Sequence, residues 1–215
     1  MAVFKREDID GFDHIYKINL MNSLSGYKSA NLIGTVSKEG IENVAVFSSV
    51  VHLGSNPPLL GYVLRPTTVP RHTYKNIKDT GFYTINHITE AITKDAHHTS
   101  AKYDSEISEF DMTELSSEYK RDFKAPFVKQ SPVKIGMKYV DEYHIKANDT
   151  ILLVGEIQFF EVADHMLQED GFLNLSKGKV ATINGLDGYA IPNLFTRYEY
   201  QRPKSIEKLK DSIIE

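Results

Sequence analysis

The 215-residue sequence contains no cysteine. Disulfide bonds, thiolate metal ligands and cysteine nucleophiles are therefore excluded. If the protein has a redox function, its electrons must be carried by a bound cofactor. This absence narrows the chemistry that the other residues can supply by themselves.

Long hydrophobic runs are also absent. No apolar stretch approaches the roughly 20 residues that span a membrane, and the N-terminal segment MAVFKREDIDGF has no apolar signal-peptide core. We expect a cytoplasmic protein without a membrane segment. The formal net charge of −4 argues against a general nucleic-acid binder, which needs a concentrated basic face.

Several functional motifs are missing. The sequence has neither G-x-G-x-x-G nor G-x-x-x-x-G-K-[ST], so a nucleotide-like cofactor would have to be bound in another way. It has no H-E-x-x-H motif, and the neighbouring His97 and His98 would point in different directions on a helix. We therefore predict no metal site, and no hydrolase constellation stands out.

The residues that are present describe an ordinary globular protein, with 41% apolar and 11% aromatic residues. Short segments rich in Val, Ile, Tyr and Phe predict strands. They are His14–Leu20, Ala30–Ser37, Val44–Leu53, Leu59–Leu64, Phe82–Ile88, Val133–Ile145, Thr150–Val162 and Leu194–Tyr200. Hairpins are predicted at Ser37–Asn43, where Glu39 and Gly40 can supply a positive φ, and at Lys146–Asp149. Short polar connections favour antiparallel pairing in a closed or nearly closed barrel, a mainly β fold with peripheral helices.

The length fits one domain over residues 1–215. A polar stretch at about 104–129 interrupts the strand pattern, and we interpret it as a surface excursion, either a solvated face or a lid. A short helical stretch is predicted from Thr89 to about His97. A C-terminal helix is predicted at about 204–214, and its narrow apolar stripe favours packing on the barrel over binding a partner.

The segment RPTTVPRHTYKNI, from Arg65 to Ile77, concentrates groups that bind anions. Pro70 suits the first turn of a helix capped by Thr68 or Val69, and the helix should run to about Thr80. The free N–H groups at that start would form a phosphate site with the nearby cationic and hydroxyl side chains. These are Arg65, Thr67, Arg71, His72 and Thr73. The alternative is a capped surface helix whose arginines are only solvated.

Two further segments are candidates for binding. The predicted strand from Val44 to Val51 is apolar on both faces except at Ser48 and Ser49, so it should be buried on both sides. The two small hydroxyl residues leave room for a flat ligand, and a central strand with a small-residue bend is the alternative. The loop Ser100–Lys102 is polar and cationic and can reach a ligand.

Taken together, these segments resemble the flavin reductase-like family of FMN-binding split-barrel proteins. The resemblance rests on "EGIENVAVFSSVVHLGSNPPLLGYVL", "RHTYKNIKDTGFYTINHI", "EFDMTELSSE", "KAPFVKQSPVKIGMKY", "ILLVGEIQFFEV" and "GLDGY", in this order, over roughly Ser29 to Tyr200. It implies a dimeric Greek-key split barrel with a flavin near the subunit interface. It also favours FMN over FAD.

The resemblance implies the following site. Val46, Phe47, Ser48 and Ser49 would lie along the isoalloxazine and ribityl chain, and Arg65, Thr67, Arg71, His72 and Thr73 would surround the phosphate. Asn86 would face the flavin from a neighbouring strand. Ser100, Ala101 and Lys102 would reach the ring or the phosphate, and Tyr189 would cover the ring from its own or the partner subunit.

The implied reaction is hydride transfer from NADH or NADPH to N5 of the flavin. Lys102, or backbone N–H groups in its place, would stabilise the negative charge that develops near N1 and the C2 carbonyl. The electrons would then pass to a monooxygenase or another acceptor. Two alternatives remain open: a reductase that retains FMN and reduces a small substrate, and a flavin-binding electron carrier without nicotinamide activity of its own.

Overall fold

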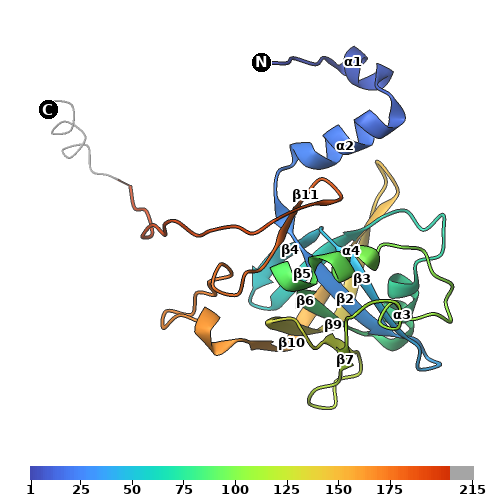
Figure 1. The fold of residues 1–215 in the computed structure, drawn as a ribbon, viewed down its shortest axis with the longest axis vertical. Helices are drawn as coiled ribbons and strands as arrows, with labels where there is room; N and C mark the ends of the chain where they lie inside the picture. Colours follow the sequence, from blue (N-terminus) through green and yellow to red (C-terminus); the bar gives the residue numbers. More distant parts are fainter. Residues whose placement is uncertain (204–215) are drawn as a thin grey trace, which may run out of the picture.

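A computed structural model describes residues 1–203 of the chain (Figure 1). The predicted C-terminal helix at about 204–214 lies outside the described residues. The described part contains one large antiparallel sheet, two small sheets and a few short helices. None of its helices is long and apolar enough to cross a membrane.

The large sheet has seven strands in the order β3-β2-β6-β9-β10-β5-β4. Every neighbouring pair is antiparallel, as predicted. The strands are β2 (Asn31–Val36), β3 (Glu42–Phe47), β4 (Val50–Ser55), β5 (Pro58–Leu64), β6 (Phe82–His87), β9 (Val133–Ile145) and β10 (Thr150–Val162). The two hairpins that the sequence predicts are both formed, with positive φ at Gly40 in the first and at Asp149 in the second.

The two edges of this sheet, β3 and β4, follow one another in the sequence. The prediction of one continuous strand from Val44 to Leu53 is therefore wrong, because the chain leaves the ladder at Ser48 and Ser49. The Ser49 Oγ accepts a hydrogen bond from the Val63 N–H (3.1 Å) and donates one to the Val63 carbonyl (2.9 Å). This contact holds the bend against β5, so that β4 can pair with β5.

The smaller sheets lie outside this ladder. One joins β1 (Lys28–Ser29), β11 (Thr182–Asn184) and β12 (Gly188–Ala190), and the other joins β7 (Ser117–Glu118) and β8 (Phe127–Val128). The three-stranded sheet connects the two ends of the domain, because β1 lies near the start of the chain and β12 near its end. It also brings β12 to one face of the large sheet.

The side chains of the strands alternate between two hydrophobic clusters. The inner cluster contains Ile33, Tyr62, Leu64, Ile77, Tyr83, Ile85, Met137 and Leu153. The outer cluster contains Ala30, Leu32, Val44, Ile88, Ile92, Ala96, Phe110, Leu115, Val128, Ala181 and Ile183. Leu32 and Ile33, which are neighbours on β2, belong to different clusters, as the two-residue period of a strand requires. Both faces of β2 are therefore buried.

The helix α3 (His72–Thr80) ends where the sequence predicts and starts later than it predicts. Gly81 follows in the left-handed conformation at φ 78°, and its N–H bonds to the Ile77 carbonyl. The residue before the first helical one is Arg71, whose carbonyl accepts the Lys75 N–H at 2.9 Å. Pro70 and its neighbours Thr68 and Val69 consequently lie in the preceding loop and do not cap the helix. The predicted helical stretch after Thr89 is confirmed as η1 (Glu90–Ile92) and α4 (Thr93–His98).

The N-terminal segment forms two helices, α1 (Arg6–Gly11) and α2 (His14–Leu24). The strand predicted at His14–Leu20 is therefore wrong. Asp13 starts α2 by accepting hydrogen bonds from the N–H groups of Ile15 (2.9 Å) and Tyr16 (3.4 Å). The two helices stand away from the barrel (Figure 1), and neither contains a buried residue.

The predicted strand Leu194–Tyr200 is not formed within the described residues. The chain there runs along the surface, where the Arg197 guanidinium lies 3.9 Å from the Phe172 ring centroid and pairs with Asp170 at 2.7 Å. Phe195 and Tyr198 remain 88% and 82% exposed. A strand-like composition did not suffice here because no described neighbouring strand supplies the hydrogen bonds.

The polar excursion at 104–129 covers the outer face of the sheet. Phe110, Leu115 and Val128 from this stretch are buried in the outer cluster. Glu109 is also buried, and its Oε2 accepts the Val44 N–H at 3.0 Å on the free edge of β3. Of the two interpretations offered by the sequence, this packing favours a lid over a solvated face.

The short η2 (Asp164–Met166) carries Met166 into a third, smaller cluster with Val133 and Val180. This cluster lies beside the inner one, since Ile135 packs against both. The three clusters together cover both faces of the central strands.

Candidate functional site

The predicted phosphate residues lie in the loop from β5 to α3 and in the first turn of α3. Arg65 and Thr67 are exposed on this loop. The Arg71 Nη2 donates to the Pro66 carbonyl at 3.4 Å, which folds the loop back on itself. The Arg71 Nε is buried and has no hydrogen-bond partner within residues 1–203. A buried guanidinium N–H without an acceptor is costly unless a ligand or water supplies one.

The first turn of α3 also lacks a side chain that accepts hydrogen bonds from its N–H groups. Arg71 precedes the helix and provides no side-chain cap, so the first N–H groups of this nine-residue helix have no capping side chain. His72 begins the helix and is partly exposed. Free N–H groups, the helix dipole and an arginine at one place form a site that suits a phosphate.

Thr73 is the predicted phosphate residue that is least available. It is 5% exposed, and its Oγ1 accepts a hydrogen bond from the Asn43 Nδ2 at 3.1 Å. The hydroxyl therefore ties α3 to β3. Its backbone N–H remains part of the first turn of the helix.

In the segment Val46–Ser49, most side chains are engaged within the protein, so a ligand would mainly meet the backbone. Val46 packs on the outer cluster, whereas the Phe47 ring points into the barrel, 5.0 Å from the Tyr62 ring and edge-on to it. The Ser49 hydroxyl is engaged with Val63. Ser48 stands in the bend between the strands and is partly exposed. The edge of β3 thus presents backbone groups and one small hydroxyl at the point where the ladder ends.

The side chain of Asn86 is engaged inside the protein. Its side chain is fully buried and forms three kinds of contact inside the protein. The Nδ2 donates to the Leu32 carbonyl (3.2 Å) and the Thr84 Oγ1 (2.8 Å), and the Oδ1 accepts the Val128 N–H (3.0 Å). Asn86 therefore fastens the end of the excursion to the sheet, and its proposed contact with a cofactor stays a prediction.

The loop Ser100–Lys102 follows α4 directly and is exposed. The N–H groups of Ser100 and Ala101 bond to the carbonyls of His97 and His98 at 3.0 Å each, so the loop continues the last turn of the helix. The His98 Nε2 lies 2.7 Å from the Tyr103 hydroxyl, which closes the loop on its other side. Lys102 is thereby presented at the tip of a short, anchored turn.

Tyr189 lies on β12 and packs against the outer cluster, as Val46 does. Its hydroxyl is 3.3 Å from the Nδ1 of His97, and the two rings meet edge-on at 5.7 Å. Burial raises the pKa of Tyr189 to about 12, with a smaller contribution from Asp187. No local pattern in the sequence indicates this pair, because 92 residues separate its members.

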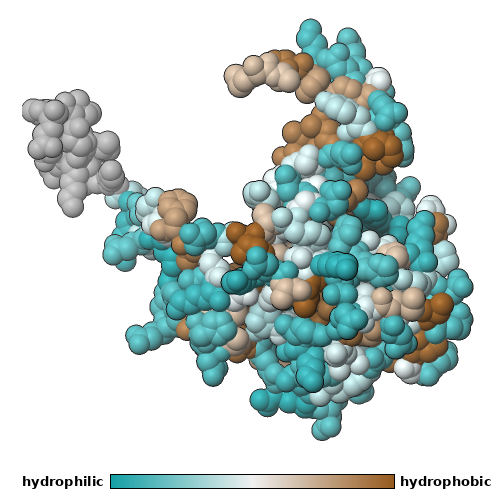
Figure 2. All heavy atoms as spheres, viewed as in Figure 1, coloured by the Kyte–Doolittle hydropathy of each residue, from teal (hydrophilic) through white to brown (hydrophobic). Residues whose placement is uncertain are grey.

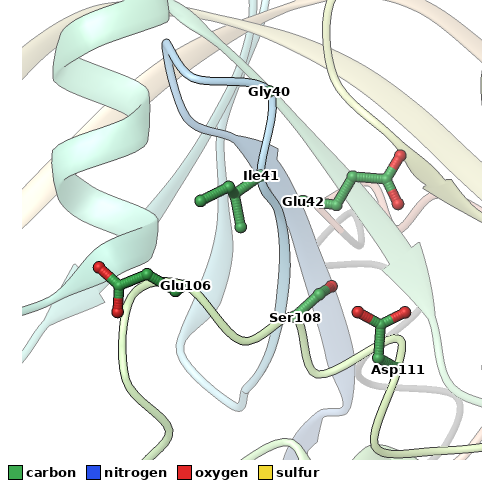
Figure 3. A pocket seen from close by; sticks show the side chains of 6 residues that line it. All are labelled: Gly40, Ile41, Glu42, Glu106, Ser108 and Asp111. Carbon is green, nitrogen blue, oxygen red and sulfur yellow. The ribbon is translucent and has the colours of Figure 1, made fainter.

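A separate hollow of about 310 Å³ lies between the start of β3 and the excursion. Figure 3 shows Glu42 and Asp111 on one side of it and Glu106 on the other. Three carboxylates would repel a phosphate, so this hollow is not the predicted anion site. The hydrogen bond from Ser105 is the largest of the effects that lower the pKa of Glu106, and the charge of His72 contributes to them.

Comparison with known proteins identifies the family. A model of the flavin reductase-like domain matches residues 24–198. The chain belongs to this family. It is 45% identical to a split-barrel protein of Shewanella frigidimarina that is assigned as a flavin reductase; the match covers 94% of this chain and 100% of that one, with a TM-score of 0.90. The predicted mainly β split-barrel fold is thereby confirmed.

Other solved structures share the fold at lower sequence identity. Nitrilotriacetate monooxygenase component B from Bacillus cereus is 19% identical, with a TM-score of 0.78 over 93% of this chain and 98% of that chain. Flavoredoxin from Desulfovibrio vulgaris is 20% identical, with a TM-score of 0.71 over 81% and 92%. An uncharacterized protein of Aquifex aeolicus is 28% identical over 187 residues, which cover 86% of this chain and 92% of the relative.

Proposed function

We propose that the protein is an FMN-binding oxidoreductase that transfers a hydride from NADH or NADPH to the flavin. The observation that carries this proposal is the uncapped start of α3 beside the unpaired, buried Nε of Arg71. The chain belongs to the flavin reductase-like family. A flavin phosphate bound here would accept hydrogen bonds both from the first N–H groups of α3 and from the Arg71 Nε.

The residues present fit the cofactor. Arg65, Thr67, Arg71, His72 and the N–H of Thr73 would hold the phosphate. The backbone of Val46–Ser49 would lie along the ring and its side chain, with Ser48 as the available hydroxyl. Tyr189 would cover the ring, and Ser100–Lys102 would close the site from the end of α4. We prefer FMN to FAD because of the resemblance to FMN-binding split-barrel proteins.

When bound, a flavin supplies the hydride acceptor for a nicotinamide. The residues of this chain contribute binding and electrostatics. Lys102 is the residue that we assign to stabilising the negative charge of the reduced ring, because it is an exposed cation in a loop whose neighbouring residues are anchored to α4. No side chain has to accept or donate a proton in the hydride transfer itself.

We also propose a homodimer with the flavin near its interface, and an electron acceptor such as a monooxygenase. The two N-terminal helices contain no buried residue, yet Ile15 and Leu24 expose 62% and 68% of their surfaces. We call α1 and α2 together the N-terminal arm, and Figure 2 shows hydrophobic side chains gathered on it. Isolated helices this short are marginal in water, so a covering partner would explain why they form.

The proposal is tested by adding FMN and then NADH or NADPH to the purified protein without oxygen and following the flavin absorbance. Bleaching at a catalytic rate supports the reductase. Flavin that binds without bleaching contradicts hydride transfer from NADH or NADPH. It supports an electron carrier, or a reductase that uses another electron donor. Absence of flavin binding overturns the proposed function.

Two variants test the site itself. We expect Arg71→Ala to weaken FMN affinity by roughly tenfold or more, the effect of losing charge-assisted hydrogen bonds worth about 1.5–3 kcal/mol. Lys75→Ala is the matched control. It also removes one positive charge from the α3 region, but the Lys75 ammonium already pairs with Asp79 at 2.8 Å. Equal loss of affinity in the two variants would contradict a phosphate site at Arg71.

A further inference from the structure

His97 and Tyr189 form a pair that joins α4 to β12. The Tyr189 hydroxyl lies 3.3 Å from the His97 Nδ1, and the ring planes are 89° apart. Tyr189 is partly buried against the outer cluster, whereas His97 is exposed to solvent. The pair therefore connects an accessible, titratable group to a side chain that lines the proposed flavin site.

The hydrogen of the Tyr189 hydroxyl can take only one direction at a time. When the imidazole is neutral and accepts at Nδ1, the hydroxyl donates to His97 and offers a lone pair on its other side. When the imidazole is protonated, Nδ1 becomes a donor and the hydroxyl hydrogen is released from the pair. The tyrosine remains protonated in both states, since burial raises its pKa to about 12.

We propose that His97 is a positioning residue that sets the direction of the Tyr189 hydroxyl, and thereby whether this tyrosine accepts from or donates to a bound flavin. This inference rests on the proposed function. With His97 protonated, Tyr189 donates to an oxygen or an anionic nitrogen of the ring. With His97 neutral, that donor is lost.

Other charged groups near the pair do not produce the same switch. On α4, Asp95 accepts the Glu114 N–H at 3.1 Å, and Lys94 lies on the same helix. His98 is bonded to Tyr103. From the turn before β12, the charge of Asp187 acts on Tyr189 and further favours its protonated form. Lys102, in the loop after α4, is exposed to solvent.

The expected effect is a pH-dependent step in flavin affinity that requires both the His97 imidazole and the Tyr189 hydroxyl. One hydrogen bond gained is worth about 0.5–1.5 kcal/mol, which corresponds to roughly 2- to 12-fold tighter binding at the acidic end. Riboflavin is the probe of choice because it has no phosphate that titrates with pH, and FMN serves as the reference ligand.

The test measures riboflavin affinity against pH in four proteins: the wild type, His97→Gln, Tyr189→Phe and His165→Gln. His165 is an exposed histidine on η2 and serves as the matched control. We expect the step in the wild type and in His165→Gln, and a flat profile in the other two. Tyr189→Phe removes the hydroxyl but retains the aromatic ring. If this variant still binds riboflavin at high pH and its affinity does not change with pH, the step is due to the hydroxyl and not to the packing of the ring.

A second readout does not depend on the ligand. ¹⁵N NMR of the neutral His97 imidazole should show the proton on Nε2, because Nδ1 accepts from Tyr189. A proton on Nδ1, or one pH profile shared by all four proteins, overturns the inference while leaving the proposed function in place. Failure of the wild type to bind either flavin overturns both.

Discussion

His87, the last residue of β6, is a partly buried histidine whose ring nitrogen Nδ1 is fully buried. It follows the buried part of β6, and its Nδ1 is buried without a partner in the part of the chain that the structure describes. Asn31, which is opposite His87 on β2, has an Oδ1 in the same condition. Burial lowers the pKa of His87 from 6.5 to about 4, because the charged form would lose its hydration.

This lowered pKa predicts acid sensitivity. The unfolded state takes up a proton near pH 6.5 and the folded state only near pH 4, so stability is lost as the pH falls through this interval. At 1.36 kcal/mol per pH unit, the loss amounts to about 3 kcal/mol below both values. Denaturant unfolding at pH 7, 5.5 and 4 should therefore show a smaller loss for His87→Gln than for the wild type. His165→Gln is the control, and an unchanged loss in His87→Gln would contradict the explanation.

Three polar residues predicted at the cofactor have side chains that hold distant parts of the fold together. Asn86 binds the Val128 N–H, Thr73 accepts from Asn43, and Ser49 holds Val63. The partners are 42, 30 and 14 residues away in the chain. Local residue types indicate that such side chains need hydrogen bonds, but only the folded chain shows which group meets the need. The Arg71 Nε is informative because it has no such partner among residues 1–203.

Among the elements, the bend between β3 and β4 depends on one side chain. Ser49 takes the place of a ladder partner for Val63, through one donated and one accepted hydrogen bond. We expect Ser49→Ala to lower the free energy of unfolding by about 1–3 kcal/mol, since both Val63 groups lose a partner. Urea unfolding measures the effect. Ser48→Ala, in the same bend, should cost less, and equal losses would argue against this role for Ser49.

An element was predicted correctly where neighbouring residues in the sequence specify both its type and its ends. The sequence predicts β9 and β10 with the observed limits, because they are long, apolar and bounded by a compact turn. The alternating pattern of His14–Leu20 suits a strand equally well, but Asp13 caps a helix there and no described strand lies alongside. For α3 the end is marked by Gly81, whereas its start depends on a backbone bond to Arg71 that composition does not specify.

For the whole molecule, the central prediction is that two copies cover each other's N-terminal arms. One chain has a mass of 24.4 kDa, so light scattering should give 2 × 24.4 = 48.8 kDa. We expect the double variant Ile15→Asp with Leu24→Asp to weaken this dimer, because the two exposed apolar side chains belong to the arm. Ile107→Asp, at a residue exposed to 41% on the excursion, is the matched control. A monomeric wild type would refute the dimer.

The sequence by itself determined the class of fold and the antiparallel hairpins, and it predicts the stretch from Arg65 to Thr73 as a candidate anion site. These follow from composition, two-residue periodicity and turn residues, which act over a few neighbouring positions. Only the tertiary structure decided which polar groups stay available, how β3 and β4 become the two edges of one sheet, and that His97 meets Tyr189. Those outcomes depend on contacts between distant segments, and burial decides whether a polar group is satisfied by the protein or remains free for a ligand.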